Sequence, residues 1–192
     1  MPGCQILRGQ EKKRELVLVF GRTGVGKTLW TRLYARQKKR VYIYDPMDEY
    51  AEPDDAAYES DPRYVERLAA AAASELRTTL IIEEAGSVFR KGVATLPKVF
   101  QDLVFRGRHY AHSAVFVGQR PTSVPIDVRS QANRVVSFAL HEGDDLDYLS
   151  DIYGRITAKK IALLPPLTCF DCLWGDTTTY SISSLVSQLR EV

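Results

Sequence analysis

The sequence has few cysteines, no long apolar run and little net charge. Three cysteines among 192 residues form an odd set without a disulfide framework, which favours a reducing, intracellular setting over a secreted one. No apolar run approaches the roughly 18 residues of a membrane span. The N-terminal stretch MPGCQILRGQEKKR lacks the apolar core of a signal peptide. A formal net charge of +2 excludes a general polycation, so any contact with nucleic acid must be local.

The remaining composition is that of an ordinary globular domain. Apolar residues make up 45% and charged residues 26% of the chain, which places it outside the disordered and fibrous classes. The length is enough for one domain with a sizeable core. We therefore expect a single domain over residues 1–192, in which residues 1–14 form a polar lead-in that can be mobile.

One stretch near the N-terminus organises this domain. Leu16 to Phe20 is a short apolar run, typical of a buried parallel strand. The next eight residues, GRTGVGKT, fit the P-loop pattern G-x-x-x-x-G-K-[ST], and Leu29 to Arg36 then has the character of a helix. The complete motif between a strand and a helix predicts a nucleotide-binding loop made of Gly21, Arg22, Thr23, Gly24, Val25, Gly26, Lys27 and Thr28.

Each part of this motif has a chemical role in holding a phosphate. Glycines allow the backbone N–H groups to turn inward around the anion. The helix that begins at the loop directs the positive end of its dipole to the same point. We expect Lys27 to reach the β- and γ-phosphates and the Thr28 hydroxyl to ligate Mg²⁺. The cofactors predicted are therefore ATP and Mg²⁺.

The rest of the chain alternates strands and helices, which predicts an α/β domain with a mainly parallel sheet and helices on both faces. We read the acidic, proline-containing stretch 47–61 as a loop and expect Gly107 and Gly154 to end helices. The further strands are expected at 40–44, 78–82, 114–118 and 134–140, the helices at 62–76, 96–106, 144–153 and 183–190, and a C-terminal β-hairpin at 168–174 and 178–182.

Two strand ends carry polar side chains suited to hydrolysis. Glu83 and Glu84 follow the apolar strand 78–82, and a carboxylate pair beside a P-loop can hold Mg²⁺ and act as general base toward water. Gln119 ends the strand 114–118, where an amide can hydrogen-bond the γ-phosphate or the attacking water.

These motifs together resemble the FtsK–HerA superfamily of additional-strand P-loop ATPases. The resemblance rests on the P-loop, the Glu83-Glu84 pair, the Asp45-Pro46…Glu49-Tyr50 stretch and the segment Arg108-His109…Gly118-Gln119-Arg120-Pro121, and it spans about residues 15 to 140. The small size is similar to that of the viral genome-packaging ATPases of this superfamily.

The resemblance implies a sheet of order 5-1-4-3-2 and a role for each site residue. Glu83 stands where the family usually has Asp, so its contact with Mg²⁺ can run through water. Glu84 matches the catalytic glutamate and Gln119 the polar sensor. Arg108 matches the arginine finger, which acts on the ATP of a neighbouring subunit, with Arg106 as an alternative. Ala111 stands where a glycine is common.

The resemblance also implies a function. It is that of a Mg²⁺-dependent ATPase that moves double-stranded DNA as a homo-oligomeric ring, a pentamer or hexamer, and packages a viral genome with a capsid vertex or portal-like protein as partner. The expected location is the cytoplasm of the host or the virion vertex. A small-molecule P-loop kinase is the alternative enzyme, and an assembly or secretion ATPase related to filamentous phage extrusion is a third class.

Other polar residues carry weaker signals. Arg90 and Lys91 lie in a glycine-containing loop after the acids and are our candidates for DNA contact. Cys169 and Cys172 form half a zinc motif at most, and a strand would point them to opposite faces, so we expect a structural role. His109 and His112 are expected to be ordinary residues at a helix–strand junction.

Overall fold

A computed structural model describes residues 14–50, 56–89, 96–184 and 186 of the chain. Its centre is a sheet of eight strands in the order β3-β2-β4-β5-β1-β6-β7-β8. The first six strands in this order are parallel to one another, whereas β7 is antiparallel to β6 and β8 is antiparallel to β7. The strands are β1 (Leu16–Phe20), β2 (Val41–Tyr44), β3 (Ala56–Glu59), β4 (Thr79–Ile82), β5 (Ser113–Gly118), β6 (Arg134–Ser137), β7 (Thr168–Leu173) and β8 (Asp176–Ser181).

The five parallel strands predicted from the sequence are present, with the neighbours expected for a 5-1-4-3-2 arrangement: β6, β1, β5, β4 and β2. The sheet differs from the prediction in extent. The sequence predicts a loop over residues 47–61, whereas Ala56–Glu59 pairs in parallel with β2 and extends one edge. The predicted C-terminal hairpin is present as β7–β8, with its second strand beginning at Asp176 instead of residue 178, and it extends the other edge through antiparallel pairing of β7 with β6.

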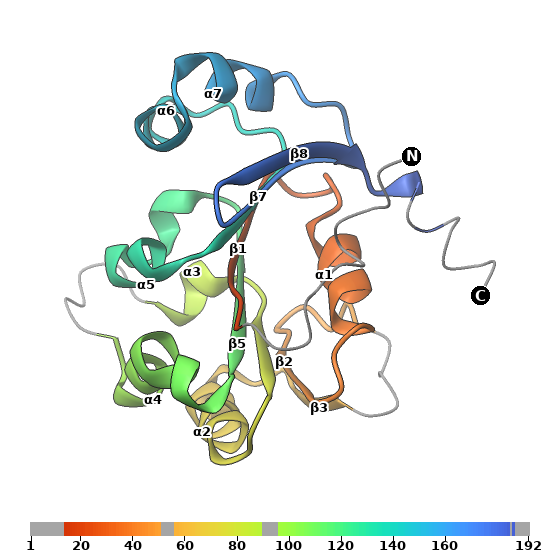
Figure 1. Ribbon diagram of the computed structural model, residues 1–192. Helices are drawn as coiled ribbons and strands as arrows, with labels where there is room; N and C mark the ends of the chain where they lie inside the picture. The colour runs from red at the N-terminus through yellow and green to blue at the C-terminus, as the bar shows by residue number, and fades with distance from the viewer. Residues whose placement is uncertain (1–13, 51–55, 90–95, 185, 187–192) are drawn as a thin grey trace.

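Helices cover both faces of this sheet (Figure 1). The side chains of β1 alternate between the two layers: Val17 and Val19 pack with Trp30 and Leu33 of α1, and Leu18 packs in the opposite layer with α2 and α4. The α-helices are α1 (Lys27–Ala35), α2 (Val65–Ser74), α3 (Ala85–Val88), α4 (Lys98–Gln101), α5 (Ile126–Gln131), α6 (Gly143–Tyr153) and α7 (Arg155–Ala162).

Several helix boundaries differ from the prediction. The amphipathic segment 96–106 is α4 followed by one π-helical turn, Asp102–Arg106. Gly107 does not end the helical path, because a 3₁₀ helix continues over Gly107–Tyr110. Gly154 does end α6, with φ of 82°. The sequence analysis predicts no helix at α3, α5 or α7. Strand β6 ends at Ser137, before the expected residue 140, and most of the predicted helix 183–190 lies outside the described residues.

The C-terminal hairpin is joined to the sheet by a buried charged cluster. Arg134 of β6 donates two hydrogen bonds to Asp171 of β7, at 3.0 and 2.7 Å, and one to Glu15 at 3.2 Å. Tyr180 of β8 also donates to Asp171, at 2.7 Å. All three charged side chains are almost fully buried. Their pairing compensates for the free energy that is lost when these charges are removed from water.

The expected structural role of the two strand cysteines is consistent with their positions. Cys169 and Cys172 are both buried and form no disulfide with each other. They lie in opposite core layers, as the alternation of strand side chains requires.

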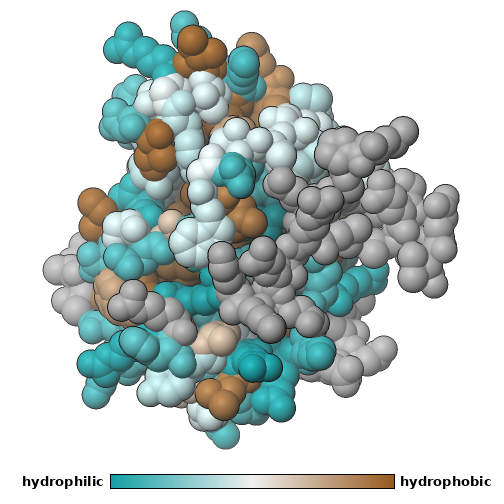
Figure 2. All heavy atoms as spheres, viewed as in Figure 1, coloured by the Kyte–Doolittle hydropathy of each residue, from teal (hydrophilic) through white to brown (hydrophobic). Residues whose placement is uncertain are grey.

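The described surface is mixed in character. Figure 2 shows hydrophobic side chains scattered among hydrophilic ones on the face in view. Within the ranges that the structure describes, no helix has both the length and the apolar character that crossing a membrane demands.

Candidate nucleotide site

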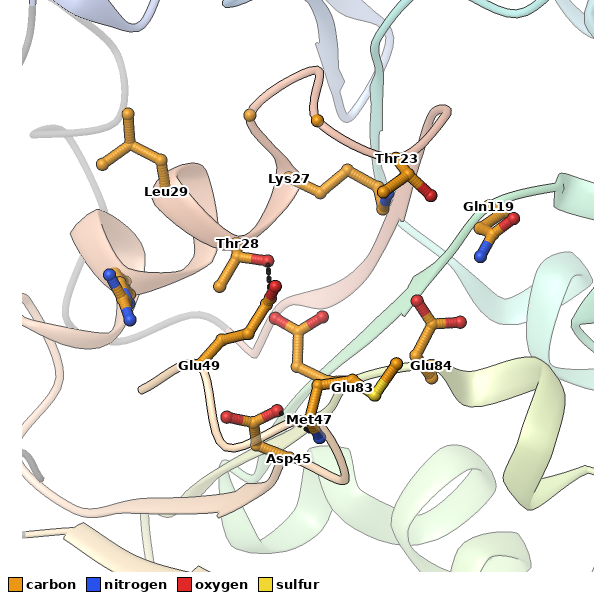
Figure 3. A pocket seen from close by; sticks show the side chains of 13 residues that line it. Thr23, Lys27, Thr28, Leu29, Asp45, Met47, Glu49, Glu83, Glu84 and Gln119 are labelled. Carbon is orange, nitrogen blue, oxygen red and sulfur yellow. Dashed lines mark hydrogen bonds between the residues drawn. The ribbon is translucent and has the colours of Figure 1, made fainter. Parts of the chain in front are cut away.

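A cavity of about 520 Å³ opens where the parallel strands β1, β2, β4 and β5 end. This is the edge at which α/β sheets bind ligands. Figure 3 shows side chains from several segments directed toward this cavity. Its lining consists of Thr23, Gly24, Gly26, Lys27, Thr28, Leu29, Arg32, Asp45, Met47, Glu49, Glu83, Glu84 and Gln119.

The backbone of the P-loop requires glycine at two positions for different reasons. Gly26, directly before α1, has φ of 112°, and a Cβ there would lie 2.9 Å from Leu167 Cδ2. A Cβ on Gly21 would lie 2.6 Å from Phe138 Cβ. The loop is therefore packed tightly from behind by residues that follow β6 and α7, which holds its backbone against the cavity.

Lys27 is the first residue of α1 and its side chain is nearly buried. Its Nζ atom donates a hydrogen bond to the carbonyl oxygen of Arg22, at 3.0 Å, across the loop. Burial lowers the pKa of Lys27, and the carboxylates of Glu84, Glu83 and Glu49 oppose that shift. Lys27 can therefore pair with an anionic ligand, and the surrounding carboxylates can face a cation bound to that ligand.

Glu83 directly follows β4 and is buried beneath the P-loop helix. Its Oε1 atom accepts hydrogen bonds from Thr31 Oγ1 at 2.9 Å and from the Tyr50 hydroxyl at 2.7 Å. Burial raises its pKa to about 7, although both hydrogen bonds act in the opposite direction. Glu83 therefore lies at the predicted place, but as an anchored side chain with little contact with solvent.

Glu84, the next residue, has a different environment. It adopts a left-handed backbone conformation with φ of 46°, directly before the short helix α3. This conformation is uncommon for a residue other than glycine, and it turns the chain so that Glu84 is less buried than Glu83 while still lining the cavity. Gln119 follows β5 and lines the same cavity from an exposed position. The structure thus brings Lys27, Glu84 and Gln119 together.

The loop after β2 contributes residues to the site that the sequence analysis did not assign. Asp45 is buried and accepts hydrogen bonds from the backbone N–H groups of Met47 and Tyr50, at 3.1 and 2.9 Å. Glu49 accepts a hydrogen bond from the Thr28 hydroxyl, at 2.8 Å. The Asp45-Pro46…Glu49-Tyr50 stretch was part of the family resemblance, and this was the only signal that could have placed these side chains in the cavity.

The predicted arginine finger does not belong to the cavity edge of its own chain. The backbone of Arg108 lies in the 3₁₀ helix before β5, whereas Gln119 lies after it. The six residues of β5 span about 20 Å at the usual rise per residue. The alternative, Arg106, forms an ion pair with Asp102 at 3.3 Å. The Arg108 side chain and the predicted DNA-contact residues Arg90 and Lys91 lie outside the described part of the structure.

The donor set around Thr28 fits Mg²⁺ and phosphate. Hydroxyl and carboxylate oxygens of Thr28, Glu49, Glu83 and Glu84 surround one side of the cavity, and such oxygens are the ligands that Mg²⁺ prefers. Within the described ranges, no group of three or more His, Cys, Asp or Glu is arranged to hold a metal ion. Nucleotide-bound Mg²⁺ needs no such group, because phosphates and waters supply most of its ligands.

Comparison with known proteins gives matches in structure and not in sequence. No protein-family model and no curated protein sequence matches the chain. The genome-packaging NTPase B204 from Sulfolobus turreted icosahedral virus 2, solved in complex with AMPPCP, is similar with a TM-score of 0.71 and 19% identity, over 88% of this chain and 97% of that one.

Two further solved structures are similar over most of this chain. The pCW3 conjugation coupling protein TcpA, with ATPγS, has a TM-score of 0.66 and 13% identity over 94% of this chain and 66% of that one. The N-terminal domain of zonular occludens toxin from Neisseria meningitidis has a TM-score of 0.58 and 16% identity over 88% and 94%. The resemblance predicted from the sequence is thus confirmed at the level of the fold, which this chain shares with viral genome-packaging and conjugation-coupling ATPases.

Proposed function

We propose that the chain is a Mg²⁺-dependent ATPase that drives the translocation of double-stranded DNA, and that it packages a viral genome into a capsid. The observation that carries the proposal is the convergence of the P-loop residues Lys27 and Thr28 with Glu84 and Gln119 on one cavity. This set supplies phosphate binding, a base for water and a polar group to orient it. The structural likeness to packaging and coupling proteins solved with ATP analogues supports ATP as the nucleotide.

Each residue of the site has a defined part in the proposed hydrolysis. Lys27 balances the charge of the β- and γ-phosphates, and Thr28 would hold Mg²⁺, which would supply further positive charge beside the phosphate oxygens. Glu84 accepts a proton from the attacking water, and Gln119 hydrogen-bonds that water or the γ-phosphate. Glu83 is too strongly anchored by Thr31 and Tyr50 to move toward the water, so we assign the base to Glu84.

The proposal includes assembly into a ring. An arginine finger whose backbone lies at the far end of β5 requires a second subunit to reach ATP. We therefore propose a homo-oligomeric ring, a pentamer or hexamer, in which Arg108 serves the neighbouring site. A ring at the capsid vertex would surround the DNA, and Arg90 and Lys91 remain our candidates for contacts with its phosphates.

A small-molecule kinase is the main rival. A kinase must exclude water and bind an acceptor, whereas Glu84 and Gln119 here line the cavity as groups suited to activate water. An assembly or secretion ATPase needs no DNA, whereas the proposed function predicts that duplex DNA increases the rate of ATP hydrolysis.

The discriminating experiment measures phosphate release from ATP by the purified protein. We expect duplex DNA to increase the rate regardless of sequence, and small nucleotide acceptors to leave it unchanged with no phosphorylated product. The Glu84→Gln variant serves as the inactive control. Transfer of the γ-phosphate to an added nucleotide would support the kinase instead, and hydrolysis indifferent to DNA would contradict translocation.

A further inference from the structure

The hydroxyl of Thr28 has a carboxylate partner in the loop after β2, where the sequence analysis assigned no metal-site residue. Thr28 Oγ1 donates a hydrogen bond to Glu49 Oε2 at 2.8 Å, and Figure 3 shows the Glu49 side chain directed at Thr28. Glu49 belongs to the loop after β2, whereas the acid predicted to lie beside Mg²⁺, Glu83, follows β4. A residue outside the predicted set therefore controls the hydroxyl of the P-loop.

Glu83 is committed to other partners. The two hydrogen bonds to its Oε1 come from Thr31, one turn further along α1, and from Tyr50. It is nearly buried, whereas Glu49 is exposed at the cavity. Glu49 thus accepts a hydrogen bond from the first turn of α1, and Glu83 accepts one from its second turn.

Glu49 is held in place although its side chain is exposed. The backbone N–H groups of Met47 and Tyr50 on either side of it donate to the buried carboxylate of Asp45. The Tyr50 hydroxyl also ties the loop to Glu83 at 2.7 Å. Anchors before and after Glu49 limit the movement of its backbone, so the carboxylate is presented to Thr28 by a fixed loop.

The chemistry of a hydroxyl gives this contact a consequence. Threonine has one O–H donor and two lone pairs. When its proton is directed to a carboxylate, the lone pairs point elsewhere, and the negative partner makes the oxygen a better ligand for a cation. Partners that orient a metal ligand in this way contribute measurably to metal affinity.

We propose that Glu49 is a positioning residue for Mg²⁺, which orients the Thr28 hydroxyl so that its lone pairs face the cation bound with the nucleotide. This inference rests on the proposed function, because it needs a Mg²⁺–nucleotide complex at the P-loop. It assigns to the loop after β2 a task in cation binding, and it leaves the base role of Glu84 unchanged.

The test is the Mg²⁺ dependence of nucleotide binding, measured with fluorescently labelled ADP. In EDTA, Glu49→Ala should bind ADP within about twofold of wild type, because its contact is with the hydroxyl and not with phosphate. The Mg²⁺ concentration that gives half of the affinity gain should rise by about 10- to 100-fold. Glu49→Gln retains an oxygen acceptor and should recover part of the loss.

Two further variants make the result specific. Asp48→Asn changes the adjoining residue, which accepts a hydrogen bond from Tyr58 and none from Thr28, and should keep the wild-type Mg²⁺ dependence. In a Thr28→Ala background, Glu49→Ala should add no further loss, because the two residues act as one unit. Thermal unfolding of each variant checks that the fold is intact.

The outcomes separate this inference from the proposed function. If wild type binds ADP and gains affinity from Mg²⁺, but Glu49→Ala shows the same gain, the assignment of Glu49 is wrong. A full effect of Glu49→Ala in the Thr28→Ala background would also overturn it, since Glu49 would then act independently of the hydroxyl. If wild type binds no nucleotide with or without Mg²⁺, the proposed function fails and the inference fails with it.

Discussion

Lys27 and Arg22 are linked across the P-loop: the ammonium group of Lys27 donates a hydrogen bond to the backbone carbonyl oxygen of Arg22, at 3.0 Å. This contact holds the ammonium group at the mouth of the loop, where the strand-end carboxylates face it. The position of the charge is thus fixed by the loop's own backbone.

Removal of this charge should weaken nucleotide binding. We expect Lys27→Ala to lower the affinity for ATP by about 10- to 100-fold, the usual range for losing a hydrogen bond between charged groups. Calorimetric titration measures the change. Lys38→Ala, which removes a lysine that lies over the Tyr34 ring and outside the cavity, is the matched control. Equal affinities of Lys27→Ala and wild type would remove Lys27 from the phosphate site.

The two adjacent acids should respond differently to the same substitution. Glu84→Gln keeps the shape of the side chain but removes the base, so ATP should still bind while turnover falls by about 10²-fold or more. Glu83→Gln keeps an oxygen that can accept from Thr31 and Tyr50, so we expect a smaller loss of turnover. Steady-state phosphate release measures both. If Glu84→Gln hydrolyses ATP normally and Glu83→Gln does not, the two roles are reversed.

Burial of Glu83 predicts a pH dependence of stability. Its pKa is raised from 4.5 to about 7, so the folded protein keeps a proton that the unfolded chain releases. The contribution of protonated Glu83 to the free energy of unfolding is fully present below about pH 4.5 and is lost as the pH rises through 7. It amounts to at most about 3 kcal/mol.

Urea unfolding in EDTA checks this prediction. The free energy of unfolding of wild type, relative to that of Glu83→Gln, should fall between about pH 5 and pH 8. Glu66→Gln, which changes an exposed carboxylate on α2, is the matched control for loss of a charge. If the difference in free energy of unfolding between wild type and Glu83→Gln stays constant over this range, the raised pKa of Glu83 is wrong.

The position of Arg108 predicts complementation between subunits. Its backbone lies at the opposite end of β5 from the cavity, so its guanidinium would act on the ATP of a neighbour. Arginine fingers contribute about 10³ to 10⁵ in rate, and Lys27→Ala and Arg108→Ala should therefore each be nearly inactive.

Mixtures of these two variants should regain part of the activity. Some interfaces then join an intact Lys27 of one subunit to an intact Arg108 of the other, which no arrangement within a single chain can provide. The same mixture with Arg106→Ala in place of Arg108→Ala tests the alternative finger. Well-folded, co-assembled mixtures that stay inactive, while mixing with wild type is tolerated, would exclude a finger acting between subunits.

Local patterns in the sequence predicted the centre of the fold well. The apolar run of β1, the P-loop and α1 follow one another within 20 residues. The order of residues in this short stretch was therefore sufficient to predict all three. Strands β1, β2 and β4 have apolar residues in nearly every position because both faces of a parallel sheet are covered. The order of the five central strands could not come from pattern alone and was implied by the family resemblance.

The elements that the sequence analysis missed lack a local pattern that marks them. Ala56–Glu59 has no strong strand pattern, and it becomes β3 because the edge of β2 is free to pair with it. Helix α7 begins directly after Gly154 without a side-chain cap, so no start signal marked it. Glu49 joins the site through a hydrogen bond to a residue 21 positions earlier, which only the folded loop reveals.

The measurement that tests the central claim most directly is displacement of a third strand from a DNA triplex by the assembled protein. A translocating ATPase that starts on an adjoining duplex should release the third strand in a reaction that requires ATP and Mg²⁺. Glu84→Gln, which still binds ATP, should release none. Release in the absence of ATP, or steady ATP hydrolysis by wild type without any release, would contradict a DNA-translocating ATPase.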